Sequence, residues 1–280
     1  MKRIIIITFA IIACLSFNTN LNAQIENFDP NEGLYKQGSV EEGGTGYYKP
    51  MQYPAIREAD VMWRKRVWRT IDFRQKMNQV FYYPTETHYN WNNFMQIILN
   101  EWQSGGMVVY EFDEKKDELH NPITYDEYLK RYGTLDYVDD RTGDSIMQID
   151  VPSIQKMNIM EDWYFDRQRS QLMVRILAIG PVINQQLGGQ DTWIQMCWVS
   201  YNDQTREIFA RSNFFNRDNP GAALNYDQVF MMRLFDSYIY KEENPYDRKI
   251  SDYAHGVDAL YESERIKQEI IDFEQNLWEY

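Results

Sequence analysis

The sequence predicts an α+β fold, an irregular mix of helices with a small, mainly antiparallel sheet and a long N-terminal arm. Segments with helical and with strand periodicity follow one another without the regular strand–helix alternation of a doubly wound sheet. Apolar residues make up 44% of the 280 residues, which is enough to bury a core. We find no internal repeat and no sustained heptad pattern, so solenoids and coiled coils are excluded.

The first 23 residues have the features of a secretory signal peptide. Lys2 and Arg3 precede a short apolar run, which is shorter than the roughly 20 residues that a transmembrane helix needs. A small-residue site follows, and we expect cleavage after Ala23. Cys14 also stands in a lipobox-like context, so lipidation at Cys14 stays open as a competing interpretation.

Residues 24–53 form the predicted arm. Glycine and proline are frequent there and apolar periodicity is weak, which favours an extended or disordered segment. Residues 54–280 then form the predicted single α+β domain.

The strongest helix prediction covers residues 56–76. At 100° per residue, Ile56, Ala59, Trp63, Val67 and Ile71 fall within one arc of about 120°. The segment is also rich in arginine and lysine, although the whole chain carries a formal charge of −13. This local excess of positive charge marks the predicted basic helix as a candidate partner-binding surface. Its candidate residues are Trp63, Arg64, Lys65, Arg66, Trp68 and Arg69.

Three interpretations of this basic helix stay open. Its cationic groups could pair with carboxylates of the same chain, with long side-chain stems packed against the domain. They could dock to an acidic surface of a partner protein. They could also bind anionic lipid at a membrane surface.

The remaining elements follow from periodicity, caps and turn residues. Further helices are predicted at residues 90–102, 124–133, 153–169, 205–215, 226–238 and 258–278. Strands are predicted at 107–112, 172–179 and 193–201, with a hairpin of 135–138 and 145–149. A capping box from Thr124 to Glu127 and a terminal Gly133 bound one helix. Gly180 and Pro181 are expected to end the strand before them.

We predict no catalytic residues, no metal site and no cofactor. His88, His120 and His255 lack metal-ligand spacing, and no nucleophile-elbow motif is present. Cys197 lies in an apolar run and is expected to be buried rather than reactive. Residues 139–144 fit a hairpin turn better than a calcium loop. The acidic charge argues against nucleic-acid binding, and a mean hydropathy of −0.62 excludes a polytopic membrane protein.

Several multi-residue runs resemble the GldN/PorN family of gliding-motility and type IX secretion proteins. The similarity extends over roughly residues 50–280. The runs are residues 57–72 (READVMWRKRVWRTID), 81–84 (FYYP), 161–170 (EDWYFDRQRS), 174–181 (VRILAIGP), 235–244 (FDSYIYKEEN) and 262–267 (ESERIK). One departure stands at residues 199–203, where the family tends to carry an aromatic-Tyr-Pro segment.

The resemblance implies a non-enzymatic, periplasmic structural subunit of the type IX secretion and gliding machinery of the Bacteroidota. Such a subunit would form a homo-oligomeric ring together with an outer-membrane lipoprotein (GldK/PorK-like), which would hold it at the outer membrane. It would also contact the periplasmic part of the motor protein (GldM/PorM-like). Two alternatives stay open, namely an exported hydrolase that uses dispersed carboxylates and a peripheral membrane-binding module.

Overall fold

The computed structural model describes residues 50, 53–85, 92–113, 119–138, 145–187, 190–214 and 224–276. The predicted signal peptide, Cys14, His88, the turn at 139–144 and nearly all of the predicted arm lie outside these residues. Their predictions, and the division of the chain into domains, therefore stay predictions.

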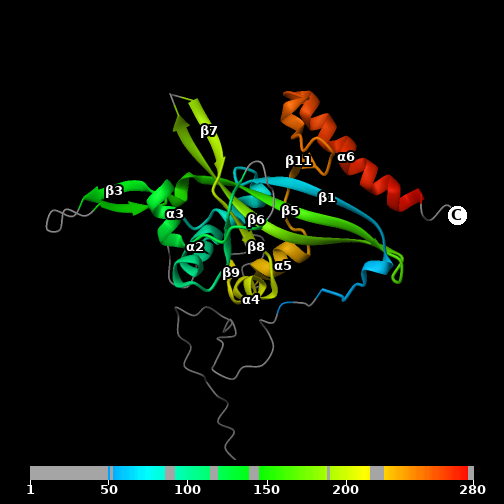
Figure 1. Ribbon diagram of the computed structural model, residues 1–280, viewed down its shortest axis with the longest axis horizontal. Coiled ribbons are helices and arrows are strands. Elements are labelled where there is room, and N and C mark those ends of the chain that lie inside the picture. Colours follow the sequence, from blue (N-terminus) through cyan, green and yellow to red (C-terminus); the bar gives the residue numbers. More distant parts are fainter. Residues whose placement is uncertain are drawn as a thin grey trace, which may run out of the picture. The chain divides into compact units, whose positions relative to one another are not determined.

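A seven-stranded sheet with exclusively antiparallel pairs lies at the centre of the fold (Figure 1). Its strands are β1 (Val61–Asp72), β2 (Val109–Glu111), β5 (Ile154–Asp166), β6 (Gln171–Leu187), β7 (Gln190–Gln195), β8 (Cys197–Ser200) and β11 (Tyr238–Glu242). Their order is β11-β1-β5-β6-β8-β2, and β7 also pairs with β6. Together with the helices, this sheet confirms the predicted α+β class.

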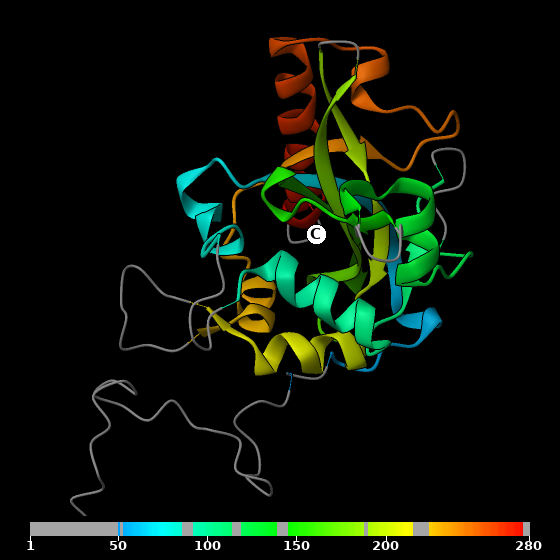
Figure 2. The same ribbon diagram turned by 90° about the vertical axis from the view of Figure 1, so that its left-hand side faces the viewer.

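Five α-helices and two small hairpins complete the described part of the chain. The helices are α2 (Phe94–Ser104), α3 (Tyr125–Tyr132), α4 (Asp203–Arg211), α5 (Tyr226–Met231) and α6 (Val257–Asn276). The hairpins pair β3 (Thr134–Val138) with β4 (Ser145–Gln148), and β9 (Asn213–Phe214) with β10 (Leu224–Asn225). Short 3-10 turns lie at Glu58–Asp60, Lys76–Phe81, Val151–Ser153 and Ile250–Asp252. In Figures 1 and 2, α2, α4 and α5 lie close together, whereas α6 lies near β1 and β11.

The main core lies between the sheet and the group formed by α2, α4 and α5. Phe94 of α2 is its aromatic centre, with ring centroids 4.8 Å from Phe209, 4.9 Å from Tyr226 and 5.4 Å from Phe230. Ile71 of β1 belongs to this core, whereas Val67 of the same strand packs with α6. Residues four apart on a strand point to the same side, so both groups of helices cover one face of the sheet.

The predicted helix at residues 56–76 is wrong, because this segment forms β1. Trp63, Val67 and Ile71 are four residues apart, and that spacing places side chains on one side of a strand as well as of a helix. The alternation of a strand was hidden because Lys65 and Arg69 occupy the positions between them on the same side. A charged residue at an inward position gives no apolar signal.

The predicted helix at residues 153–169 is also wrong, because it is the strand β5. Glu161 interrupts the apolar residues on its inward face, and Met160 and Tyr164 are buried on the other face, so the polar–apolar alternation is lost. The expected break at Gly180 and Pro181 does not occur either, because β6 continues through both residues. A Cβ atom at Gly180 would lie 2.9 Å from the carbonyl oxygen of Cys197, so the close packing of the sheet requires glycine there.

The other helix predictions are confirmed with shifted ends. Thr124 and Glu127 form the predicted capping box of α3, and Gly133 follows its last turn. Asn93 caps α2 in the same way, and Gly105 ends it in the left-handed conformation. The helix predicted at 226–238 is shorter than expected, because α5 stops at Met231 and the chain enters β11.

Candidate interaction surface

The six predicted partner-binding residues all lie on β1, where strand geometry separates them onto two faces. Trp63, Lys65 and Arg69 face α6 and the helical side of the sheet. Arg64, Arg66 and Trp68 face the opposite side. The structure therefore does not bring the six side chains together on one continuous surface.

On the helical side, β1 is fastened to α6. The Trp63 ring stacks on Phe273 with centroids 4.5 Å apart. Lys65 Nζ lies 2.7 Å from Glu242 Oε2 and 3.2 Å from Glu269 Oε2. These contacts use both side chains to hold the C-terminal helix on the sheet.

Arg69 belongs to a buried charge cluster on the same side. Its Nε lies 3.2 Å from Oε2 of Glu161, and Arg233 Nη1 lies 2.8 Å from the other oxygen of that carboxylate. Glu161 is fully buried, and Trp163 Nε1 donates a hydrogen bond to it at 3.1 Å. Burial lowers the pKa of the Arg69 guanidinium, while the charge of Glu161 acts in the opposite direction. Arg69 is thus an internal residue.

On the opposite side, Asp162 of β5 binds two of the arginines. Arg66 Nε lies 2.6 Å and Arg64 Nη1 3.2 Å from its carboxylate, and Arg64 also lies 3.3 Å from Glu243. Trp68 is 5% exposed and packs with Met160, Ala178 and Trp198. Arg64 has the largest exposed side-chain fraction of the four basic candidates, 44%.

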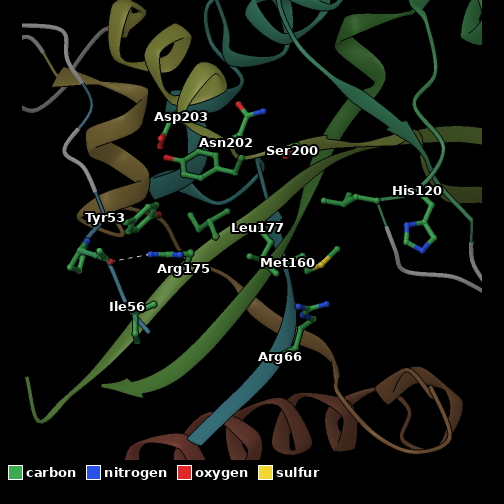
Figure 3. Close-up of a pocket in the computed structure, with 15 residues that line it drawn as sticks. Tyr53, Ile56, Arg66, His120, Met160, Arg175, Leu177, Ser200, Asn202 and Asp203 are labelled. Atoms are coloured by element: carbon green, nitrogen blue, oxygen red, sulfur yellow. Dashed lines mark hydrogen bonds between the residues drawn. The ribbon is translucent and has the colours of Figure 1, made fainter. Parts of the chain in front are cut away.

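The same side of the sheet contains an open pocket with a volume of about 1030 Å³ (Figure 3). Four segments far apart in the sequence line it, together with Arg66 of β1 and Met160 of β5. These segments are residues 53–56, 119–120, 175–177 and 200–203. Figure 3 shows Arg175 and Leu177 of β6 between Tyr53 on one side and His120 on the other.

A buried network holds the wall of the pocket at Tyr53. The guanidinium carbon of Arg206 lies 4.5 Å from the centroid of the Tyr53 ring, and Arg206 Nε donates to Asp227 at 2.9 Å. Tyr201 donates its hydroxyl to the same carboxylate at 2.9 Å. Burial raises the pKa of the Tyr53 phenol, so this side chain is neutral at physiological pH. The network therefore holds Tyr53, and with it the chain segment that leads to β1, against α4.

The described residues offer no assembled metal site. No group of three or more potential ligands among them could hold a metal ion, and His120 and His255 are exposed. Cys197 is buried as predicted, and burial raises the pKa of its thiol to about 12. No helix in the described ranges is long and apolar enough to cross a membrane.

The pocket could not be predicted from the sequence, because its walls come from segments separated by up to about 150 residues. One signal was present. Arg175 stands alone in the apolar run of residues 174–181, and a single cation in a buried strand indicates either an internal partner or a site.

Comparison with known proteins gives one family. A model of the family described as gliding motility associated protein GldN matches residues 56–279. No curated protein is significantly similar to the chain. The family match begins just before β1 and includes all the strands and helices described above. Because it spans far more than half of the sequence, the chain belongs to the GldN family.

Proposed function

We propose that this chain is a non-enzymatic structural subunit of the type IX secretion and gliding machinery. In this proposal it works in the periplasm, in a ring with a GldK/PorK-like outer-membrane lipoprotein, and contacts a GldM/PorM-like motor protein. The observation that carries the proposal is the GldN family match over residues 56–279. The signal-like N-terminus supports the compartment.

The hydrolase alternative gains no support from the geometry. A pair of carboxylates is the usual requirement for acid–base hydrolysis of this kind, and Asp203 is the single carboxylate among the described residues that line the pocket. Where a carboxyl group of the described residues has a clearly shifted pKa, the shift is downward. These groups are Asp72, Glu127, Asp166 and Glu262. A general acid needs a raised pKa.

The membrane-binding alternative is not supported, because the basic helix on which it depends is absent from the described residues. It required a basic amphipathic helix at residues 56–76, and this segment is a strand whose cations pair with Asp162, Glu161 and Glu242. Cations that are neutralised inside the fold attract anionic lipid weakly.

The proposal is tested by isolating the tagged chain from detergent-solubilised envelopes and identifying the associated proteins by mass spectrometry. We expect a lipoprotein and a motor protein in fixed ratio to the chain, retained in high salt if the interface is extensive. Recovery of the chain without either protein would refute the partner assignment.

A further inference from the structure

Arg175 is unusual among the residues of the pocket, because none of the described carboxylates pairs with it. Its Nη2 donates to the carbonyl oxygen of Pro54 at 3.3 Å, and its guanidinium carbon lies 5.0 Å from the Tyr53 ring centroid. Its Nε–H is buried and has no acceptor in the described part of the chain. The side chain as a whole is only half-buried, so a ligand in the pocket could accept hydrogen bonds from the accessible N–H groups of this charged donor.

The other charges of the pocket do not neutralise Arg175. Arg66 is paired with Asp162 at 2.6 Å. Asp203 lies at the rim, where its side chain is 89% exposed and 3.9 Å from Arg206. Although the chain has a net charge of −13, the described residues thus leave the positive charge of Arg175 without a carboxylate partner on this wall of the pocket. Charge complementarity favours an anionic ligand, and the planar guanidinium matches a carboxylate in particular.

The base of the pocket beside Arg175 is apolar. Met160 and Leu177 lie there, and Ile56 and Leu119 are also among the lining residues. The pairing of β5 with β6 shifts by one residue between Met160 and Glu161, which leaves Leu177 as the extra residue of a bulge. Bulges of this kind redirect a side chain out of the regular pleat. The half-buried Leu177 can therefore bury an apolar group of a ligand.

The size and openness of the pocket suit several residues of an extended chain. Its volume of about 1030 Å³ lies at the upper limit of small-molecule sites, which span about 300–1,000 Å³. Ser200 and Asn202 at the rim offer hydrogen bonds to a peptide backbone. We propose that the pocket binds an extended acidic segment of a partner protein, with one carboxylate at Arg175 and a neighbouring apolar side chain on Leu177 and Met160.

This inference goes beyond the assembly role, because a peptide site can exist whether or not the chain forms a ring. It is tested with the purified chain and a panel of fluorescein-labelled octapeptides in which one Leu or Phe is flanked by Asp and Glu. A matched panel carries Asn and Gln instead. Fluorescence anisotropy measures binding of both panels.

We expect acidic peptides to bind and their neutral analogues to bind at least about tenfold more weakly, since hydrogen bonds to charged groups are the strong ones. Arg175→Gln should weaken the acidic peptides by a similar factor, Arg175→Lys by less, and Leu177→Gln by several-fold. The exposed Arg167 in the β5–β6 turn supplies the control, and Arg167→Gln should bind like the unaltered chain. Circular dichroism and urea titration confirm that each variant is folded.

Equal binding of acidic and neutral peptides, or of the unaltered chain and Arg175→Gln, would overturn the proposal. So would the absence of binding by every acidic peptide. Binding of decanoate that depends on Arg175, without peptide binding, would identify a small amphiphile as the ligand and also overturn it. Since the assay needs no partner protein, its failure leaves the assembly proposal standing.

Discussion

Arg69 of β1 and Glu161 of β5 form an ion pair of 3.2 Å between neighbouring strands, in a place where Glu161 has no exposed surface. Arg233, which follows α5, binds the same carboxylate at 2.8 Å. The pair lies where the core around α5 approaches the core around α6. Through the carboxylate of Glu161, the strands β1 and β5 are thus linked to the segment that follows α5.

Glu161→Gln should destabilise the fold strongly. The substitution leaves the buried Arg69 without its counter-charge, and breaking a buried pair in this way costs about 3–5 kcal/mol. Urea denaturation measures the loss. Glu207→Gln, at a half-exposed position of α4, is the control and should change the free energy of unfolding by less than about 0.5 kcal/mol. A loss below about 1 kcal/mol for Glu161→Gln would show that the pair is dispensable.

Ile266→Ala should loosen α6 from the sheet. Ile266 is fully buried with Val67 and Ile239, and truncation of such a side chain costs about 2–5 kcal/mol. Leu260, which is 57% exposed on the same helix, is the matched control. Leu260→Ala should change the free energy of unfolding by less than about 0.5 kcal/mol. Equal effects of the two substitutions would contradict the docking of α6 described above.

Cys197 should be inert in the folded protein. Burial raises the pKa of its thiol to about 12, so hardly any thiolate exists at pH 8. In protein that begins at Gln24, Ellman's reagent should label this cysteine at pH 8 only as fast as the protein unfolds, and rapidly in urea. Because the thiol ionises more readily in the unfolded chain, its contribution to stability should be lost as the pH rises from about 9 to 12. Rapid labelling of folded protein would contradict the packing of β8.

The carboxylate of Asp166 should make the free energy of unfolding depend on pH in the acidic range. A side-chain hydrogen bond from Arg169, at 2.6 Å, lowers the pKa of this carboxyl group, and the backbone amide of Gln168 donates to it at 2.8 Å. A lowered folded pKa gives a contribution that is present at neutral pH and lost as the pH falls. Asp166→Asn should therefore lower the urea midpoint at pH 7, and the difference from the unaltered chain should shrink as the pH falls and the carboxyl group of Asp166 becomes protonated. A difference independent of pH would reject the ion-pair explanation.

Arg64→Glu should impair assembly without unfolding the chain. Arg64 is the most exposed of the four basic candidates, and surface ion pairs such as those with Asp162 and Glu243 are worth only about 0–1 kcal/mol. We expect less lipoprotein to be recovered with this variant than with Arg57→Glu, whose side chain is 75% exposed outside the strand. Full recovery with Arg64→Glu would remove β1 from the list of docking surfaces. Arg69→Glu is unsuitable for this purpose, because Arg69 is buried.

The fold class was predictable from the sequence, although two long strands were not. The predicted capping box from Thr124 to Glu127 acts locally, so its effect does not depend on the rest of the fold. The strands β1 and β5 were predicted as helices, because Arg69 and Glu161 occupy inward positions and interrupt the apolar pattern. The two charges neutralise each other between the paired strands. A single strand cannot reveal that its charged residue has a partner about 90 residues away.

The candidate surface was predictable only in part. The basic residues of β1 stand out in an acidic chain. Because the segment is a strand and not the predicted helix, successive side chains point to opposite faces of the sheet. Predicting the pocket would have required the register of β5 with β6 and the contact of Tyr53 with Arg206. Both join residues that are distant in the sequence. Arg175 could be noticed in the sequence, but its lack of an internal carboxylate could not.

Ring assembly can be measured as the mass of the particle that contains this chain, by mass photometry after mild detergent extraction from native envelopes. A structural ring subunit predicts a particle in the megadalton range in which the chain and a lipoprotein recur in constant proportion. A lone chain of monomer mass in the same extracts, with the envelope intact before lysis, would contradict it.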